Sequence, residues 1–328
     1  MKADELKELV KKMDDKQKNK LIALLYNKVP KSKKEDVDEN VMAILENKPA
    51  VKKVKVTSFE DIKNEAYEFI DLAESGEYYR GRKVSKKDKS NWRYKAANIA
   101  KALFEIKKDS PYFDEATGLL INMYMILGYG ATYGTFVTFN TFSAIKISNE
   151  QFLYNIINRL FAKEITDNVI LKAMDLVLYP YTDSNTLKFE IAFCLYDNLM
   201  HINYDEEEID SIFIDKIVNS KHNENKRYSY DEQMDSYAKR TAYNALVLAY
   251  LYYLLANNNL SDSSIDFIFD SYDESDNEIK LYVLFSYALD GYQKEYIHLY
   301  DYLVKKYKIK PRDSLKERYL KEKEKLHE

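Results

Sequence analysis

The sequence from Gln293 to Tyr307 reads Gln-Lys-Glu-Tyr-Ile-His-Leu-Tyr-Asp-Tyr-Leu-Val-Lys-Lys-Tyr. Its apolar and aromatic residues recur at positions i, i+3, i+4, i+7, i+8 and i+11, which places them on one face of an α-helix. The residues of this face are Tyr296, Leu299, Tyr300, Leu303, Val304 and Tyr307. Such a face needs a neighbouring element to cover it, so the stretch predicts a helix packed against other helices.

The same helical period recurs along most of the chain after residue 57, and the breaks fall at glycine, proline or Asp/Ser/Asn clusters. The chain has only seven glycines and five prolines in 328 residues, which disfavours turn-rich all-β folds and disorder. We therefore predict an all-α fold of stacked antiparallel helix pairs, an irregular α-solenoid or helical-repeat array. The predicted helices are Ser58 to Ala73, Lys89 to Ile106, Tyr112 to Leu127, Asn149 to Phe161, Asp167 to Leu178, Asn185 to Met200, Asp205 to Val218, Asp231 to Ala256, Asp262 to Ser271, Asn277 to Leu289, Gln293 to Tyr307 and Asp313 to Leu326.

The first 56 residues have a different organisation. Two short apolar sets at helical spacing, Leu6 to Met13 and Leu21 to Leu25, predict a small N-terminal helical hairpin. A short helix from Val37 to Leu45 follows. The sequence thus predicts an N-terminal domain over 1–48, a basic linker over 49–56 and a helical-repeat domain over 57–328, with a subdivision conceivable near 128–148.

Helix starts recur about every 15 to 25 residues, so pairs repeat at the roughly 34 to 47 residues typical of tetratricopeptide or HEAT-like arrays. The segment Ala288-Leu289-Asp290-Gly291-Tyr292, with the helix that follows it, resembles the helix-turn-helix boundary of a tetratricopeptide repeat. The resemblance covers less than a tenth of the chain, and the units do not align to a family consensus. It implies an α-helical repeat protein whose stacked pairs form an extended binding face.

The stretch from Gly128 to Ser143 interrupts the helical pattern and could hold a long loop. Its portion Thr135 to Phe142 is rich in β-forming residues, yet its phenylalanines are spaced by three. Strand and helix both stay open, and helix is favoured. The glycines from Gly128 to Gly134 do not match a nucleotide-binding loop, because the third glycine is misplaced and no lysine follows.

The most distinctive local feature is the basic segment from Arg80 to Lys95, which holds eight basic residues and one acid in a chain of net charge −4. Such a concentration suits an anionic ligand, and nearby aromatic rings could stack on unpaired bases. The candidate anion- or nucleic-acid-binding residues are Arg80, Arg82, Lys83, Lys86, Lys87, Lys89, Trp92 and Arg93. The alternative is a solvated loop entering a helix capped near Ser85 or Ser90, with Trp92 in the core.

Motifs for catalysis, metals and cofactors do not emerge. The four histidines and one cysteine form no C-x-x-C or H-E-x-x-H arrangement. Two E-x-x-H spacings, at His298 and His327, read as chance matches on helix surfaces rather than as di-iron ligands. Cys194 lies in an apolar run and reads as a core residue. We predict no catalytic residues, no metal and no cofactor.

Three functions remain open. The leading interpretation is a non-catalytic interaction or scaffold protein that binds a protein or peptide partner through its helical-repeat surface. The alternative is a nucleic-acid-binding regulator or defence-type protein that uses the basic segment on single-stranded nucleic acid. An enzyme with a helical site that lacks a motif, for example around Tyr243, Tyr250 and Tyr253, is the third. The single cysteine and the lack of a long apolar run predict a cytoplasmic protein with no membrane partner, and the oligomeric state is left open.

Overall fold

The structure of the chain is a computed structural model that describes residues 3–29, 34, 37–38, 41–42, 58–183, 186–221, 230–287 and 291–326. Across these ranges the regular secondary structure consists of fifteen helices, with no strand. The all-α prediction is therefore confirmed. The chain forms two compact units, Met1–Ser58 and Phe59–Glu328.

The first unit contains helices α1 (Ala3–Lys11) and α2 (Asp15–Asn27). Asp14 starts α2 with a capping box, because its carboxylate accepts the Gln17 backbone N–H at 2.7 Å and the Gln17 side chain accepts the Asp14 N–H at 3.1 Å. The two predicted helices thus form, but α2 has no buried residue, and Ile22 is 63% exposed. Leu9 of α1 and Ile22, Leu24 and Leu25 of α2 are therefore largely exposed to solvent. The predicted helix from Val37 to Leu45 lies largely outside the described residues, and the predicted linker 49–56 lies wholly outside them.

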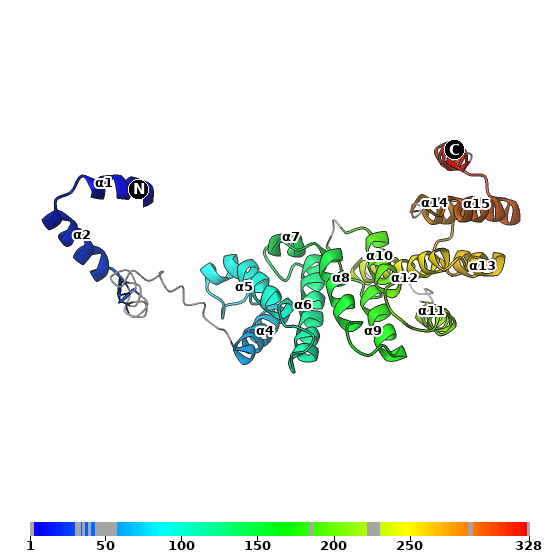
Figure 1. Cartoon of the computed structure of the whole chain (residues 1–328). Helices are drawn as coiled ribbons and strands as arrows, with labels where there is room; N and C mark the ends of the chain where they lie inside the picture. Colours follow the sequence, from blue (N-terminus) through cyan, green and yellow to red (C-terminus); the bar gives the residue numbers. More distant parts are fainter. Residues whose placement is uncertain are drawn as a thin grey trace. The chain divides into compact units, whose positions relative to one another are not determined.

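The second unit contains all twelve helices predicted after residue 57, each within a few residues of its predicted bounds except at one end of α6 (Figure 1). One short helix, α7, was not predicted. The helices are α4 (Phe59–Glu74), α5 (Lys86–Phe104), α6 (Phe113–Tyr133), α7 (Thr141–Ile145), α8 (Asn149–Leu160), α9 (Asp167–Val177), α10 (Lys188–Leu199), α11 (Glu206–Ser220), α12 (Tyr230–Ala256), α13 (Asp262–Ser271), α14 (Asn277–Ser286), α15 (Gln293–Tyr307) and α16 (Asp313–Lys325).

The helices of the second unit pack in pairs. Consecutive helices contact each other at α4 and α5, α8 and α9, α11 and α12, and α14 and α15. Helices two apart also pack, as α4 does on α6, α6 on α8, α8 on α10 and α10 on α12. Each amphipathic face is therefore covered by more than one neighbour, and a single hydrophobic core runs from α4 to α16.

Helix α12 lies at the centre of the later part of this core. It packs against α9, α10, α11 and α13, and every side chain from Ala242 to Leu255 is at most 8% exposed. Tyr243, Tyr250 and Tyr253, on which the enzyme interpretation relied, belong to this buried stretch. The Tyr250 hydroxyl donates a hydrogen bond to Asp210 at 2.5 Å. The three tyrosines therefore serve packing.

The segment after α6 corrects the sequence-based prediction. Helix α6 continues through the glycines to Tyr133, and Gly134 ends it with φ +67°, a left-handed conformation that suits glycine. Residues 134–140 are irregular, and helix resumes only at Thr141. The prediction of a helix over 135–142 is therefore wrong for all but its last two residues.

Core packing explains this irregular segment. Phe136 is 1% exposed, and its ring stacks on Trp92 with 4.1 Å between the centroids and on Phe69 with 5.9 Å. A Cβ atom on Gly130 would lie 2.6 Å from the Phe136 ring, so only glycine leaves room for it. The loop is thus held by one aromatic side chain inserted beside α4, α5 and α6.

No helix among the described residues is both long enough and apolar enough to cross a bilayer.

Candidate functional site

The basic segment lies on the turn between α4 and α5 and on the first turns of α5. Ser85 caps α5, because its hydroxyl accepts the Asp88 backbone N–H at 3.1 Å and donates to the Asp88 carboxylate at 2.6 Å. The preceding turn is closed by the Glu77 carboxylate, which accepts the backbone N–H of Lys83 at 2.8 Å. Of the two capping residues considered, Ser85 or Ser90, the structure has Ser85, and the helix starts at Lys86, three residues earlier than predicted.

Six of the predicted site residues are exposed cations, and we call them the α5 cationic surface. They are Arg80, Arg82, Lys83, Lys86, Lys87 and Arg93. Two of these cations lie over tyrosine rings: Arg80 is 4.9 Å from the centroid of Tyr79, and Arg93 is 5.0 Å from that of Tyr94. The side chains of the other four have no hydrogen-bond or ion-pair partner in the described part of the chain.

Two predicted residues have different roles. The Lys89 amine donates a hydrogen bond to the Gly81 carbonyl, so it closes the turn rather than extending into solvent. Trp92 is 3% exposed and lies under the surface against Phe136, so its ring is not available for stacking on a base. The expectation that Trp92 contacts a ligand is therefore wrong, because the indole fills the core. Of the neighbouring aromatic rings, Tyr79 and Tyr94 are about half exposed.

The two lysines at the start of α5 do not stabilise the helix. The N-terminus of an α-helix carries partial positive charge, so cations in its first turn cost roughly 0.3–1 kcal/mol each at an exposed site. Lys86 and Lys87 occupy the first two positions of α5, and Asp88 is the only acid in that turn. Local stability therefore does not account for the cations, whereas the N-terminus and the lysines together suit an anion.

The exposed face of α5 leads from this surface to a groove. Lys87, Tyr94 and Lys101 are all exposed and follow one another at seven-residue intervals, two helical turns apart, so they lie along one face. A groove of about 730 Å³, which we call the α5 groove, begins beside Lys101 and is bounded by α5, α7 and α8. Its other exposed cations are Lys107 and Lys108, and its one acid, Glu105, lies 3.9 Å from Lys101.

Arg159 is the remaining cation of the α5 groove, and it is structural. Its guanidinium donates to the carbonyls of Ile106 at 2.8 Å, Phe104 at 3.3 Å and Phe113 at 3.4 Å, and to the Thr117 hydroxyl at 3.1 Å. These carbonyls lie at the end of α5, in the following loop and at the start of α6. Burial lowers the pKa of Arg159. The side chain fastens α8 to the α5–α6 connection.

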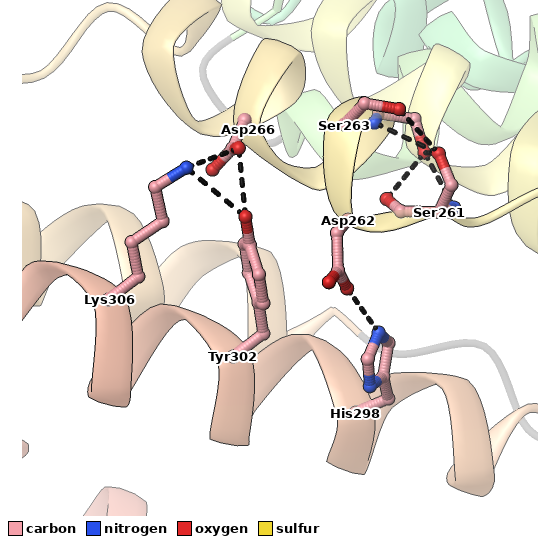
Figure 2. Close-up of polar contacts among 8 residues, drawn as sticks. Ser261, Asp262, Ser263, Asp266, His298, Tyr302 and Lys306 are labelled. Carbon is pink, nitrogen blue, oxygen red and sulfur yellow. Dashed lines mark hydrogen bonds and ion pairs between the residues drawn. The ribbon is translucent and has the colours of Figure 1, made fainter.

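His298, which matched an E-x-x-H spacing in the sequence, contacts an aspartate of another helix and not a set of metal-binding glutamates. His298 of α15 contacts the Asp262 carboxylate of α13 at 2.9 Å, and Lys306 and Tyr302 contact Asp266 one helical turn away (Figure 2). Among the described residues, no three histidine, cysteine or acidic side chains gather as a metal site would require. His327 lies outside those residues.

The contact around Asp266 joins α13 to α15. Burial alone would raise the pKa of Asp266, but the hydrogen bonds from Lys306 and Tyr302 outweigh it and lower the pKa below its ordinary value. The same contact raises the pKa of Lys306. In Figure 2 the Asp266 contact is therefore an interhelical clamp made of an ion pair with Lys306 and a hydrogen bond from the Tyr302 phenol, and the His298–Asp262 contact lies beside it.

Cys194 is not an activated nucleophile. The residue is 4% exposed, its S–H group donates to the Glu150 carbonyl at 3.3 Å, and burial, reinforced by nearby carboxylates, raises the pKa of the thiol to about 12. His201 instead contacts the Asp197 carbonyl through Nδ1. The prediction of a core cysteine is confirmed. Sequence reasoning missed, however, that one edge of Cys194 borders a cavity.

A comparison with protein-family models, with curated proteins and with solved structures finds no match. No family is therefore identified for the chain, and the tetratricopeptide-like residues 288–290 lie outside the described part.

Proposed function

We propose that this protein is a non-catalytic binding protein that holds an anionic macromolecular partner on the α5 cationic surface. Its helix pairs form the scaffold, stacked as an irregular α-solenoid. The packing of alternate helices, α4 on α6, α6 on α8 and α8 on α10, supports this arrangement. Stacked pairs of this kind create extended faces for macromolecular ligands.

One observation carries the proposal. Arg82, Lys83, Lys86 and Lys87 are exposed side by side without a carboxylate partner in the described residues, in a chain whose net charge is −4. An isolated positive field on an acidic protein favours one confined anionic contact over broad electrostatic adhesion. The lysines at the start of α5 also oppose the helix dipole, so a partner explains them better than the fold does.

The residues around the α5 cationic surface fit single-stranded nucleic acid better than they fit other anionic partners. From Lys86 to Lys101 the exposed face of α5 runs for about 22 Å at 1.5 Å per residue. Tyr79 and Tyr94 lie beside the cations with exposed rings, which suits base stacking. The α5 groove adds the Asn98 amide one turn before Lys101, and Lys107 and Lys108 beyond it. An acidic protein segment would pair with the cations, but it has no bases to stack on Tyr79 and Tyr94 or to bond to the Asn98 amide.

Binding can be measured by fluorescence anisotropy, with labelled single-stranded RNA and DNA oligomers titrated at low and moderate salt. The test variant replaces Arg82, Lys83, Lys86 and Lys87 by alanine. We expect wild type to bind with an affinity that falls as salt rises, and we expect the variant to lose at least about tenfold and to show a shallower salt slope. A labelled polyglutamate peptide is run alongside.

A control variant of equal charge change separates a specific surface from net charge. It replaces Lys294, Lys305, Lys310 and Lys321, four exposed lysines of α15, α16 and their connection, by alanine. We expect this control to bind like wild type. Equal losses in both variants, or no binding of either oligomer by wild type, would contradict the nucleic-acid proposal. Binding of polyglutamate alone would assign the surface to an acidic protein instead.

A further inference from the structure

A second candidate site lies away from α5, where four helices enclose a cavity of about 630 Å³ that we call the Glu150 pocket. Glu150 and Tyr154 come from α8, Glu190 and Phe193 from α10, and Tyr252 from α12. The end of α14 closes the remaining side. The volume lies within the roughly 300–1,000 Å³ usual for small-molecule sites.

Aromatic residues make up half of the pocket lining. They are Tyr154, Phe189, Phe193, Tyr252 and Tyr287. Phe189 stacks on Tyr287 with 4.5 Å between the centroids, which fixes the contact between α10 and the end of α14. Phe193 is 41% exposed, so its ring lies at the mouth, whereas Tyr252 is 1% exposed at the base. Faces of such rings carry negative electrostatic potential and attract cations.

The charges of the pocket have one sign. Glu150 and Glu190 both line it, and no lysine, arginine or histidine among the described residues does so. The half-buried Glu150 carboxylate has no hydrogen-bond or ion-pair partner in the described part of the chain. Asp197, just outside, accepts a hydrogen bond from the Tyr154 hydroxyl at 3.0 Å. A partly desolvated carboxylate without a counter-charge favours a positive ligand.

One neighbouring group, the Cys194 thiol, responds to this negative field. After burial, the carboxylates of Glu150 and Glu190 are the next causes that raise the pKa of Cys194, which borders the pocket. The nearest cation on α10, Lys188, donates its amine to Thr182 instead of lining the pocket, and burial lowers its pKa to about 8. At the α14 end, the buried Ser286 hydroxyl has no hydrogen-bond partner among the described residues, so it can bond to a ligand.

We propose that the Glu150 pocket binds a small organic cation with an apolar body. The cationic group lies against the rings of Tyr154 and Phe193 with Glu150 as its counter-charge, and the apolar body fills the space toward Tyr252. The volume exceeds what a single methylated amine requires, so the ligand is larger than the cationic group itself. This proposal does not depend on the function of α5.

Helix capping also uses these glutamates, and the test must separate the two roles. Glu150 lies in the first turn of α8, and the Glu190 carboxylate accepts the Leu187 backbone N–H at 2.8 Å at the start of α10. Glu190 is therefore needed for the helix end. Glu150 is the better target, because Ser148 already caps α8 through the Gln151 N–H at 3.3 Å.

Isothermal titration calorimetry of the full chain tests the proposal with benzyltrimethylammonium and choline, and with 3,3-dimethylbutan-1-ol as the uncharged analogue of choline. We expect both cations to bind saturably, benzyltrimethylammonium more tightly, and the uncharged analogue to bind roughly tenfold more weakly than choline. Glu150→Gln should weaken cation binding by roughly tenfold, while Glu317→Gln, an exposed change on α16, should leave it unchanged.

A second variant keeps the test decisive if Glu150→Gln perturbs α8. Phe193→Leu keeps an apolar side chain at the mouth and removes the ring, and it should weaken choline more than 3,3-dimethylbutan-1-ol. Absence of saturable binding by both cations would overturn the proposal. Equal affinity for choline and its uncharged analogue would also overturn it, as would unchanged cation binding in both pocket variants.

Discussion

The α5 cationic surface and the Glu150 pocket are built in opposite ways. The first comes from residues close together in the chain, between 80 and 93, on one turn and one helix start. The second comes from four helices whose lining residues lie between 150 and 287. A cluster of charged residues that are neighbours in the sequence can be found from the sequence alone. A site assembled from distant helices can be found only in the folded structure.

The α5 cationic surface and the Glu150 pocket also differ in how much their residues contribute to the stability of the fold. The surface cations are exposed and have few partners, so they can change without disturbing the core. The pocket wall belongs to the core: Tyr252 is 1% exposed and Cys194 is 4% exposed. We therefore expect substitutions at the surface to alter binding without lowering the free energy of unfolding, while substitutions at the base of the pocket also lower it.

The largest expected effect concerns Arg159, a cation near α5 that has a structural role. Arg159→Met would remove the guanidinium that donates to the carbonyls of Phe104, Ile106 and Phe113, and we expect the free energy of unfolding to fall by roughly 2–4 kcal/mol. Urea denaturation followed by circular dichroism measures it. Lys107→Met and Lys108→Met, in the same groove, should each change it by less than about 0.5 kcal/mol. Similar losses in all three would show that Arg159 is not structural.

An intermediate effect should appear at alkaline pH in both regions. Burial raises the pKa of Tyr78, below the cationic surface, and of Tyr196, beside Tyr252, to about 12 in each case. An unfolded tyrosine ionises near pH 10, so this contribution to stability is complete below about pH 10 and is lost as pH rises toward the folded-state value.

The measurement is the free energy of unfolding between pH 9 and 11, for wild type, Tyr78→Phe and Tyr196→Phe. Each variant should lose less stability than wild type as pH rises through about 10, because phenylalanine has no phenol to ionise. If a variant keeps the full wild-type slope, its tyrosine is not protected from ionisation by burial. Unequal changes in the two variants would rank the two regions by how well they exclude water.

The smallest expected effect is a gain. Lys86→Ala and Lys87→Ala remove cations from the first turn of α5, so each should raise the free energy of unfolding by about 0.3–1 kcal/mol. Thermal or urea unfolding of the single variants at low salt measures it, and added salt should reduce the gain. A loss of stability instead would mean that these lysines have partners in the folded chain, and it would weaken the case for a ligand.

The helical period allowed the fold class and the twelve helices after residue 57 to be predicted, because amphipathic faces depend on local spacing. The segment around Phe136 was missed, since its conformation follows from a cavity beside Trp92 and Gly130 that local spacing does not encode. The basic residues were found from composition, but the burial of Trp92 was decided by the same tertiary contacts. The Glu150 pocket gave no sequence signal, because its rings and carboxylates are ordinary helix residues until four helices meet.

Trp92 is the only tryptophan in the chain, and it lies between the cationic surface and the Phe136 ring. Its fluorescence therefore comes from a single place, close to α4, α5 and α6 and separate from the pocket-forming helices. Emission on denaturation would report when that part of the molecule opens, while circular dichroism averages over every helix. Trp92 is thus an intrinsic fluorescent label. A comparison of its emission with circular dichroism shows, without an added dye, whether the region around α4, α5 and α6 unfolds together with the rest of the helices.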